Sequence, residues 1–385
     1  MAKILKNYQF FCAVAVLIGT IVGAGTFGLP YVMAQAGFGL GLFYLIILTG
    51  AVTLIHLSYG EIVLRTEQSH RLVGYAEKYL GRGAKTFAAI VLLFEYYGSL
   101  LAYIILGGEF LRIIFSRFLG GSETFWVLVF FALGMLAILF GLRFVSNGEF
   151  FMMLALVGLM AALVIKGWPL FDGQNLIGAN WANWLLPYGV ILFALAGSVA
   201  VPEMRQALKG QERKLKTAIF LGTVIPAVLY LVFVLAVVGI SGSATSEDAI
   251  SGLVPYFGPW IVQIGAIFGL LAVYTSFIVV GLSLKNIYRD DYHLSEGPAF
   301  FLICAIPLAA YLAGIKSFIL VIGFVGAIMA GLDGILTIAI YLKAKKNGDR
   351  RPEYSLSGAK TLGLFLILIF TFGIVINMIS FFTNK

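Results

Sequence analysis

The stretch Gly19-Thr20-Ile21-Val22-Gly23-Ala24-Gly25-Thr26-Phe27-Gly28-Leu29-Pro30 places four glycines and a proline inside the first apolar segment of the chain. Glycine and proline weaken helix interiors, and a backbone group freed from its helix in hydrocarbon is costly unless something binds it. Glycines in membrane helices also serve close packing, which needs no ligand. If the helix breaks here, free N–H groups can face an anion and free carbonyls a cation.

The composition is that of a membrane protein. Of 385 residues, 61% are hydrophobic and 11% are charged, and the mean hydropathy is +1.00. Because a spanning helix needs about 20 apolar residues, we expect an all-α integral membrane protein with about eleven spans in one domain, residues 1–385. The expected spans are 8–34, 38–62, 84–117, 124–142, 149–166, 183–209, 214–240, 258–288, 296–313, 316–340 and 361–382.

The basic residues predict the orientation. Most of the 26 lysines and arginines fall in loops of one side if the N-terminus is cytoplasmic. The chain should therefore be a multi-pass plasma-membrane protein with a cytoplasmic N-terminus and an extracellular C-terminus. This arrangement explains the net charge of +8 without a nucleic acid partner. The segment 65–85 should form a short amphipathic helix at the cytoplasmic interface.

The residues that carry metal and enzyme chemistry are sparse. The two cysteines, Cys12 and Cys304, lie in apolar spans, and none of the three histidines has a partner at metal-ligand spacing. No histidine-rich cluster or Ser–His–Asp set accompanies the spans. We expect neither an enzyme nor a cofactor.

A second interruption, Phe193-Ala194-Leu195-Ala196-Gly197-Ser198-Val199-Ala200-Val201-Pro202, lies in the sixth span. Broken spans at corresponding places in two halves are typical of a transporter site at the midplane. The second interruption lies five spans after the first, and an odd offset inverts the second half in the membrane. The sequence therefore predicts inverted repeats at about 8–166 and 183–340, with 361–382 as an additional helix.

The motif GTIVGAGTFGLPYVMAQAG at 19–37 resembles the first-helix signature of the amino acid/auxin permease family and its aromatic amino acid permease relatives. This family lies within the amino acid-polyamine-organocation superfamily. Further segments resemble family segments in the same order over nearly the whole chain: Leu72-Val73-Gly74-Tyr75-Ala76-Glu77-Lys78-Tyr79-Leu80-Gly81, Ile105-Leu106-Gly107-Gly108-Glu109, Val201-Pro202-Glu203 and Thr275-Ser276-Phe277. The resemblance implies a five-plus-five inverted repeat in which helices 1 and 6 unwind around an amino acid.

The resemblance also implies which residues bind the substrate. Backbone amides of the first break should face its carboxylate, as helix N-termini attract anions: Gly23, Ala24, Gly25 and Thr26. Carbonyls should face its amino group: those of Ile21, Phe193, Ala194 and Ala196. Small residues such as Gly197 leave room for a bulky side chain. We expect a neutral substrate, aromatic or hydrophobic.

Sodium-coupled relatives with this fold hold a cation between the first and eighth helices. The corresponding oxygens here are the carbonyls of Gly19 and Val22 and the groups of Ala272, Thr275 and Ser276, which share one helix face. The alternative is that the two hydroxyls only donate to carbonyls one turn earlier.

Carboxylates in the spans support a competing, proton-coupled mechanism. Glu95 in the third span and Asp333 in the tenth are ionisable groups within the membrane, where such groups are functional candidates. Glu203, beside Arg205, and Glu61, four residues before Arg65, could instead form cytoplasmic gate pairs or ordinary solvated pairs.

The sequence thus predicts a monomeric secondary active amino acid transporter in the lipid bilayer, coupled to Na⁺, that works by alternating access. A proton symporter or an exchanger is the first alternative. A sensor that binds an amino acid without transporting it is the second.

Overall fold

The computed structural model describes residues 2–140 and 157–383, and the regular structure in these ranges is entirely helical. Its main helices are α1 (Ala2–Ile21), α2 (Gly25–Ala36), α3 (Phe38–Arg65), α4 (Leu72–Leu80), α5 (Arg82–Leu119), α6 (Glu123–Leu139), α8 (Leu186–Leu195), α9 (Val201–Ala207), α10 (Leu215–Ser241), α11 (Val254–Phe257), α12 (Pro259–Asn286), α13 (Glu296–Leu312), α14 (Phe318–Phe324), α15 (Gly331–Asn347) and α16 (Ala359–Thr383).

Seven helices of the described ranges are long and apolar enough to span a membrane, and the bent pair α1 and α2 makes an eighth. Three shorter apolar helices accompany them: α6, Val157–Leu170 and α13. The predicted all-α membrane fold is confirmed, while the number of eleven spans stays a prediction. The expected spans 124–142 and 149–166 fall partly on 141–156, outside the described residues. The expected interfacial helix of 65–85 is α4.

The first predicted break is real but shorter than the glycine-rich stretch. α1 ends at Ile21, α2 begins at Gly25, and the two axes differ by 56°. Gly19 lies within α1 and Pro30 within α2. Only Val22, Gly23 and Ala24 are therefore outside a helix.

The second break lies between α8 and α9. α8 ends at Leu195, and a 3₁₀ turn (Ser198–Ala200) leads into α9. Gly197 has φ −165° and ψ 4°, outside the helical region. Both predicted interruptions thus end a helix in the middle of a span.

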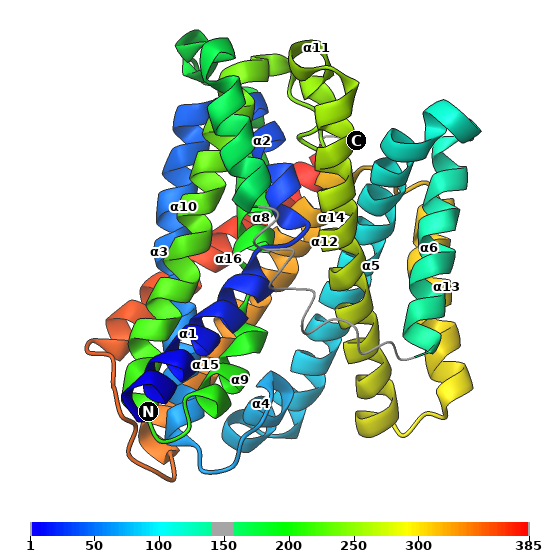
Figure 1. The fold of residues 1–385 in the computed structure, drawn as a ribbon. Coiled ribbons are helices and arrows are strands. Elements are labelled where there is room, and N and C mark those ends of the chain that lie inside the picture. Colours follow the sequence, from blue (N-terminus) through cyan, green and yellow to red (C-terminus); the bar gives the residue numbers. More distant parts are fainter. Residues whose placement is uncertain (1, 141–156, 384–385) are drawn as a thin grey trace.

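The helices form two groups in Figure 1. α1, α2, α3, α8, α9 and α10 stand on one side, and α5, α6, α12 and α13 on the other. α5 packs along α12 and α6, whereas α1 packs on α10 and α9. We call the face that holds α4 the lower face and the face that holds α11 the upper face, as drawn in Figure 1.

The connection 348–358 between α15 and α16 folds over the lower end of α3. The N–H groups of Asp349 and Arg350 both donate to the Arg65 carbonyl, at 3.1 and 3.2 Å, and the Tyr354 hydroxyl donates to the Leu57 carbonyl at 2.6 Å. We call this segment the strap. It ties α15 and α16 to the end of α3.

Candidate functional site

A cavity of about 800 Å³ connects both helix breaks with the lower face. At its upper end it is lined by residues of the two breaks, including Gly23, Ala24 and Gly197. At its lower end it reaches exposed residues such as Arg71 and Tyr292. The breaks are therefore accessible from one face.

Most of the predicted substrate residues line this cavity: Ile21, Gly23, Ala24, Gly25, Phe193, Ala196 and Gly197. Thr26 and Ala194 do not, and both are buried. The Thr26 amide donates to the Gly23 carbonyl at 3.1 Å. Within the described residues, the amides of Gly23, Ala24 and Gly25 donate to no backbone carbonyl. The anion site that the sequence predicts thus has three available amides rather than four.

Tyr230 of α10 joins the two breaks, and no sequence pattern singles it out among 18 tyrosines. Its fully buried hydroxyl lies 2.7 Å from the Ile21 carbonyl and 2.9 Å from the Ala194 carbonyl. These are the last turns of α1 and α8, where helices have carbonyls without intrahelical partners. One hydroxyl proton is therefore shared by two of the four carbonyls expected to face an amino group.

The predicted cation oxygens lie partly together. A Cβ built on Gly23 would be 3.4 Å from the Ser276 hydroxyl, so the first break contacts α12 at that residue. The Ala272 carbonyl accepts from Thr275 at 3.1 Å and from Ser276 at 2.9 Å. The expected back-bonding alternative is therefore present. A hydroxyl that donates in this way still has oxygen lone pairs for a cation.

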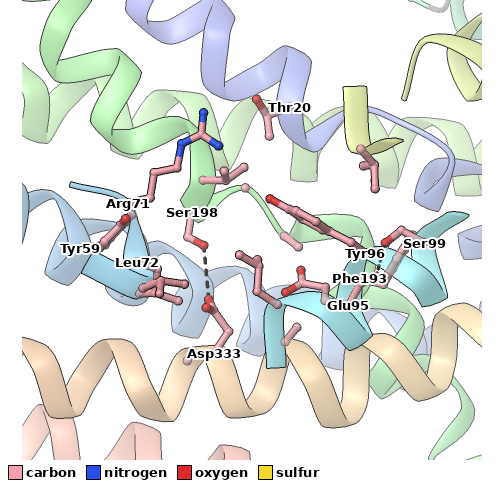
Figure 2. Close-up of a pocket in the computed structure, with 18 of the residues that line it drawn as sticks. Thr20, Tyr59, Arg71, Leu72, Glu95, Tyr96, Ser99, Phe193, Ser198 and Asp333 are labelled. Carbon is pink, nitrogen blue, oxygen red and sulfur yellow. Dashed lines mark hydrogen bonds between the residues drawn. The ribbon is translucent and has the colours of Figure 1, made fainter. Parts of the chain in front are cut away.

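Glu95 and Asp333 face the same cavity from α5 and α15, as Figure 2 shows. Asp333 accepts a hydrogen bond from Ser198 in the second break at 3.3 Å. Arg71, at the start of α4, also lines the cavity. The carboxylates of Glu95 and Asp333 and the second break thus line the same cavity.

Glu203 lies elsewhere. It is exposed on α9 and does not line the cavity. Arg205, its expected partner, instead donates to the Val63 and Thr66 carbonyls at 2.6 and 3.0 Å. Arg205 therefore fastens α9 to the lower end of α3, where carbonyls of the last turn need donors.

Glu61 does pair with Arg65, at 2.8 Å, but the pair is not solvated. The Glu61 carboxylate is fully buried and also accepts from Ser355 (2.9 Å), the Leu356 N–H (2.7 Å) and Tyr341 (3.3 Å). We call these five residues the Glu61 cluster. Three of its members lie 280 to 295 residues away from Glu61 in the chain, so no local pattern could reveal them.

The strap also meets α4. Lys78 donates to Asp349 Oδ2 at 2.5 Å, and the Glu67 N–H donates to Oδ1 at 2.9 Å. The hydrogen bond from Lys78 holds the pKa of the Asp349 carboxyl below its ordinary value. The strap is thereby held by charge as well as by backbone hydrogen bonds.

Comparison with known proteins places this arrangement among amino acid transporters. The model of the tryptophan/tyrosine permease family matches residues 6–380. Glutamine transporter 2 of Aliivibrio fischeri is 26% identical, over 97% of this chain and all of the relative. Tyrosine-specific transport system 1 of Haemophilus influenzae is 27% identical, over 94% of each chain. These relatives are transport proteins, not enzymes.

The fold is also that of a solved structure. The crystal structure of MhsT in complex with L-phenylalanine superimposes with a TM-score of 0.66 at 15% identity, covering 96% of this chain and 97% of MhsT. The likeness confirms the predicted fold class.

Proposed function

Because this chain belongs to the tryptophan/tyrosine permease family, we propose that it is a secondary active transporter for a neutral amino acid, with an aromatic or hydrophobic one as the first candidate. The observation that carries this proposal is the cavity that joins two helix breaks to one face. A site reached from a single face at a time is what alternating access requires. The narrower kinship with amino acid/auxin permeases, suggested by the first-helix motif, is part of the proposal.

The substrate carboxylate would accept hydrogen bonds from the amides of Gly23, Ala24 and Gly25, at the positive end of α2. Its ammonium group would face the carbonyls at the end of α8, around Phe193 and Ala196. Tyrosine is the first candidate substrate, since two relatives are named as tyrosine-specific systems. A third is named as a glutamine transporter, which makes glutamine the second candidate.

Sodium is the proposed coupling ion. The oxygens of Gly19, Val22, Ala272, Thr275 and Ser276 would supply the hard ligands that Na⁺ prefers, and the contact between Gly23 and Ser276 supports their proximity. Uptake of labelled tyrosine and glutamine into proteoliposomes under an imposed Na⁺ or H⁺ gradient tests this. Uptake that ignores the Na⁺ gradient would contradict the ion assignment, and Thr275→Ala should reduce sodium dependence more than substrate selectivity.

Proton coupling is the second candidate because Glu95 and Asp333 line the cavity beside the second break. In that mechanism Glu95→Gln would change the pH dependence of uptake. If wild type and Glu95→Gln show the same pH dependence of uptake, Glu95 has a structural role and does not couple protons.

A sensor would bind without moving its ligand, so counterflow in the same liposomes separates it from a transporter. Ala24→Leu is the matching variant, since Ala24 is 1% exposed and lines the cavity. A leucine there would crowd the three amides and should abolish amino acid binding while the protein stays folded. Unchanged affinity would place the pocket elsewhere.

The lower face is proposed to be cytoplasmic, with the extracellular C-terminus that the basic loops predict. The structure would then be the inward-facing state. We also propose inverted repeats at 8–166 and 183–340, an additional helix at 361–382, and a monomer in the plasma membrane.

A further inference from the structure

His56 of α3 is a buried polar side chain in the wall of the cavity, and none of the proposed roles uses it. It is 1% exposed and lines the cavity together with Val52, Ile55 and Tyr59 of the same helix. A buried imidazole normally has partners for both ring nitrogens, because an unmade hydrogen bond in such surroundings is costly.

One nitrogen is accounted for. His56 Nδ1 lies 2.9 Å from the hydroxyl of Thr223 on α10, and this hydroxyl lies 2.9 Å from the Ile219 carbonyl. A carbonyl can only accept, so the single hydroxyl proton of Thr223 points to Ile219. In this arrangement the Thr223 oxygen accepts from His56, and the proton of the imidazole is assigned to Nδ1.

The other nitrogen is left as an acceptor. With the proton on Nδ1, Nε2 of the neutral ring carries a lone pair, and the bond to Thr223 is the one hydrogen bond of this ring within residues 2–140 and 157–383. No carboxylate in those ranges forms an ion pair with the ring. Because His56 lines the cavity, a molecule in the cavity can supply the donor for this acceptor.

We infer that His56 is a specificity-determining residue that selects amino acids whose side chain ends in an O–H or N–H donor. This inference rests on the proposed function, because the donor is the side chain of the transported amino acid. Tyrosine offers a phenol hydroxyl to Nε2, whereas phenylalanine of nearly the same shape offers none. A site built to accept a hydrogen bond rejects the analogue that leaves its acceptor unpaired.

Displacement of labelled tyrosine from the purified full-length protein, by tyrosine and by phenylalanine, tests the inference. The wild type should bind tyrosine about tenfold more tightly than phenylalanine, the effect of one buried hydrogen bond. His56→Leu should bring this ratio close to one, mainly by weakening tyrosine binding. Thr223 keeps its bond to Ile219 in this variant, so the contact between α3 and α10 loses only one hydrogen bond.

The control is Thr53→Val on the same helix, where a buried hydroxyl donates to the Thr49 carbonyl and does not line the cavity. This variant should keep the wild-type ratio. If His56→Leu does not fold, Thr223→Val replaces it, and the ratio should fall because the ring loses its fixed tautomer.

An equal ratio in wild type and His56→Leu would overturn the inference, as would a wild type that does not prefer tyrosine. In both cases amino acid binding and counterflow remain, so the proposed function survives. If no amino acid binds at all, the proposed function itself fails.

Discussion

In the upper half of the molecule, backbones and rings pack closely beside the helix breaks, whereas in the lower half hydrogen bonds and ion pairs hold the helix ends around the cavity. In the upper half, Gly25 of α2 meets the backbone of Ala194, and a Cβ on Gly25 would lie 2.7 Å from its Cα. The ring of Phe27 packs edge-on against Phe110 at 5.0 Å and Phe233 at 6.2 Å. In the lower half, the Glu61 cluster and the strap hold the helix ends.

Under the proposed transport function, this difference indicates that the cavity is closed toward the upper face. Dry contacts between close backbones exclude water and substrate, since interiors packed to this density hold few voids. Polar contacts at helix ends can exchange their partners for water when helices move. Under the proposed transport function, the upper half would close the path from the cavity to the upper face, and four variants test the two halves in turn.

The largest effect is expected from Gly326→Ala in the upper half. A Cβ on Gly326 would lie 1.8 Å from the Gly189 carbonyl oxygen and 2.7 Å from the Phe193 nitrogen. Both are backbone atoms, so α8 must shift as a whole, and we expect the folded protein to be lost, as judged by size-exclusion chromatography in detergent. Gly323→Ala is the matched control, because its Cβ would meet only Val190 at an ordinary 3.8 Å. Equal behaviour of both variants would contradict close packing of the upper half.

Glu61→Gln tests the lower half. It leaves Arg65 without its carboxylate and turns one of the two carboxylate acceptors into an amide nitrogen, next to donors from Arg65, Ser355 and Leu356. We expect a loss of about 3 kcal/mol in the free energy of unfolding, measured by denaturant titration in detergent. The control, Glu296→Gln, removes a carboxylate that is 75% exposed and should change it by less than about 1 kcal/mol. A Glu61 effect no larger than the control would mean that polar contacts do not hold the lower half.

Tyr230→Phe tests the boundary between the halves. It removes the single hydroxyl proton that the Ile21 and Ala194 carbonyls share, at a cost of about 2 kcal/mol in unfolding free energy. Tyr188→Phe is the control, because the buried Tyr188 hydroxyl has no partner within the described residues. Loss of the Tyr188 hydroxyl should leave the free energy of unfolding unchanged or raise it. If thermal unfolding shows the same shift for both variants, Tyr230 does not join the two breaks.

The smallest effect is expected from Lys78→Met at the strap. The ion pair with Asp349 is about one-third exposed, so its loss should lower the unfolding free energy by under about 1 kcal/mol. The pKa of Asp349 is lower in the folded protein than in the unfolded chain, where it is about 4. The ion pair therefore adds its full stability at a pH above the unfolded pKa, and this stability is lost as the pH falls through the folded pKa. The stability difference between wild type and variant should therefore vanish below this window. If the variant is still less stable than the wild type at that low pH, the loss comes from packing of the lysine side-chain methylenes and not from the ion pair.

The positions of the breaks could be predicted, but the extent of the first could not. A glycine can allow a helix to unwind, or it can allow a neighbouring helix to approach the backbone closely. The sequence alone does not distinguish these two roles. Gly23 lies in the break, whereas Gly25 and Gly28 admit Ala194 and Ile322 to the backbone of α2. A Cβ on Gly19 would have no atom within 4 Å, so no close approach requires a glycine there, and α1 continues through this position.

Long-range polar partners are the other part that could not be predicted. The span limits follow from hydropathy, which is a local property, and most of them agree with the described helices within a few residues, although α1 begins at Ala2 rather than at 8 and α15 ends at Asn347 rather than at 340. The partners of Glu61, Tyr230 and His56 depend on helix rotations and on the course of the strap. A pattern along one segment contains no information on which side chain a neighbouring helix presents.

The length of α5 has a consequence for the surrounding lipid. Its 38 residues measure about 57 Å, nearly twice the roughly 30 Å hydrocarbon thickness of a bilayer. Its ends carry Arg82 and Lys85 on one side and Arg112 and Arg117 on the other, so they extend beyond the hydrocarbon and only the apolar stretch between them meets the acyl chains. Because Glu95 lies on this stretch and lines the cavity, a change in the tilt of α5 would move its carboxylate relative to the helix breaks.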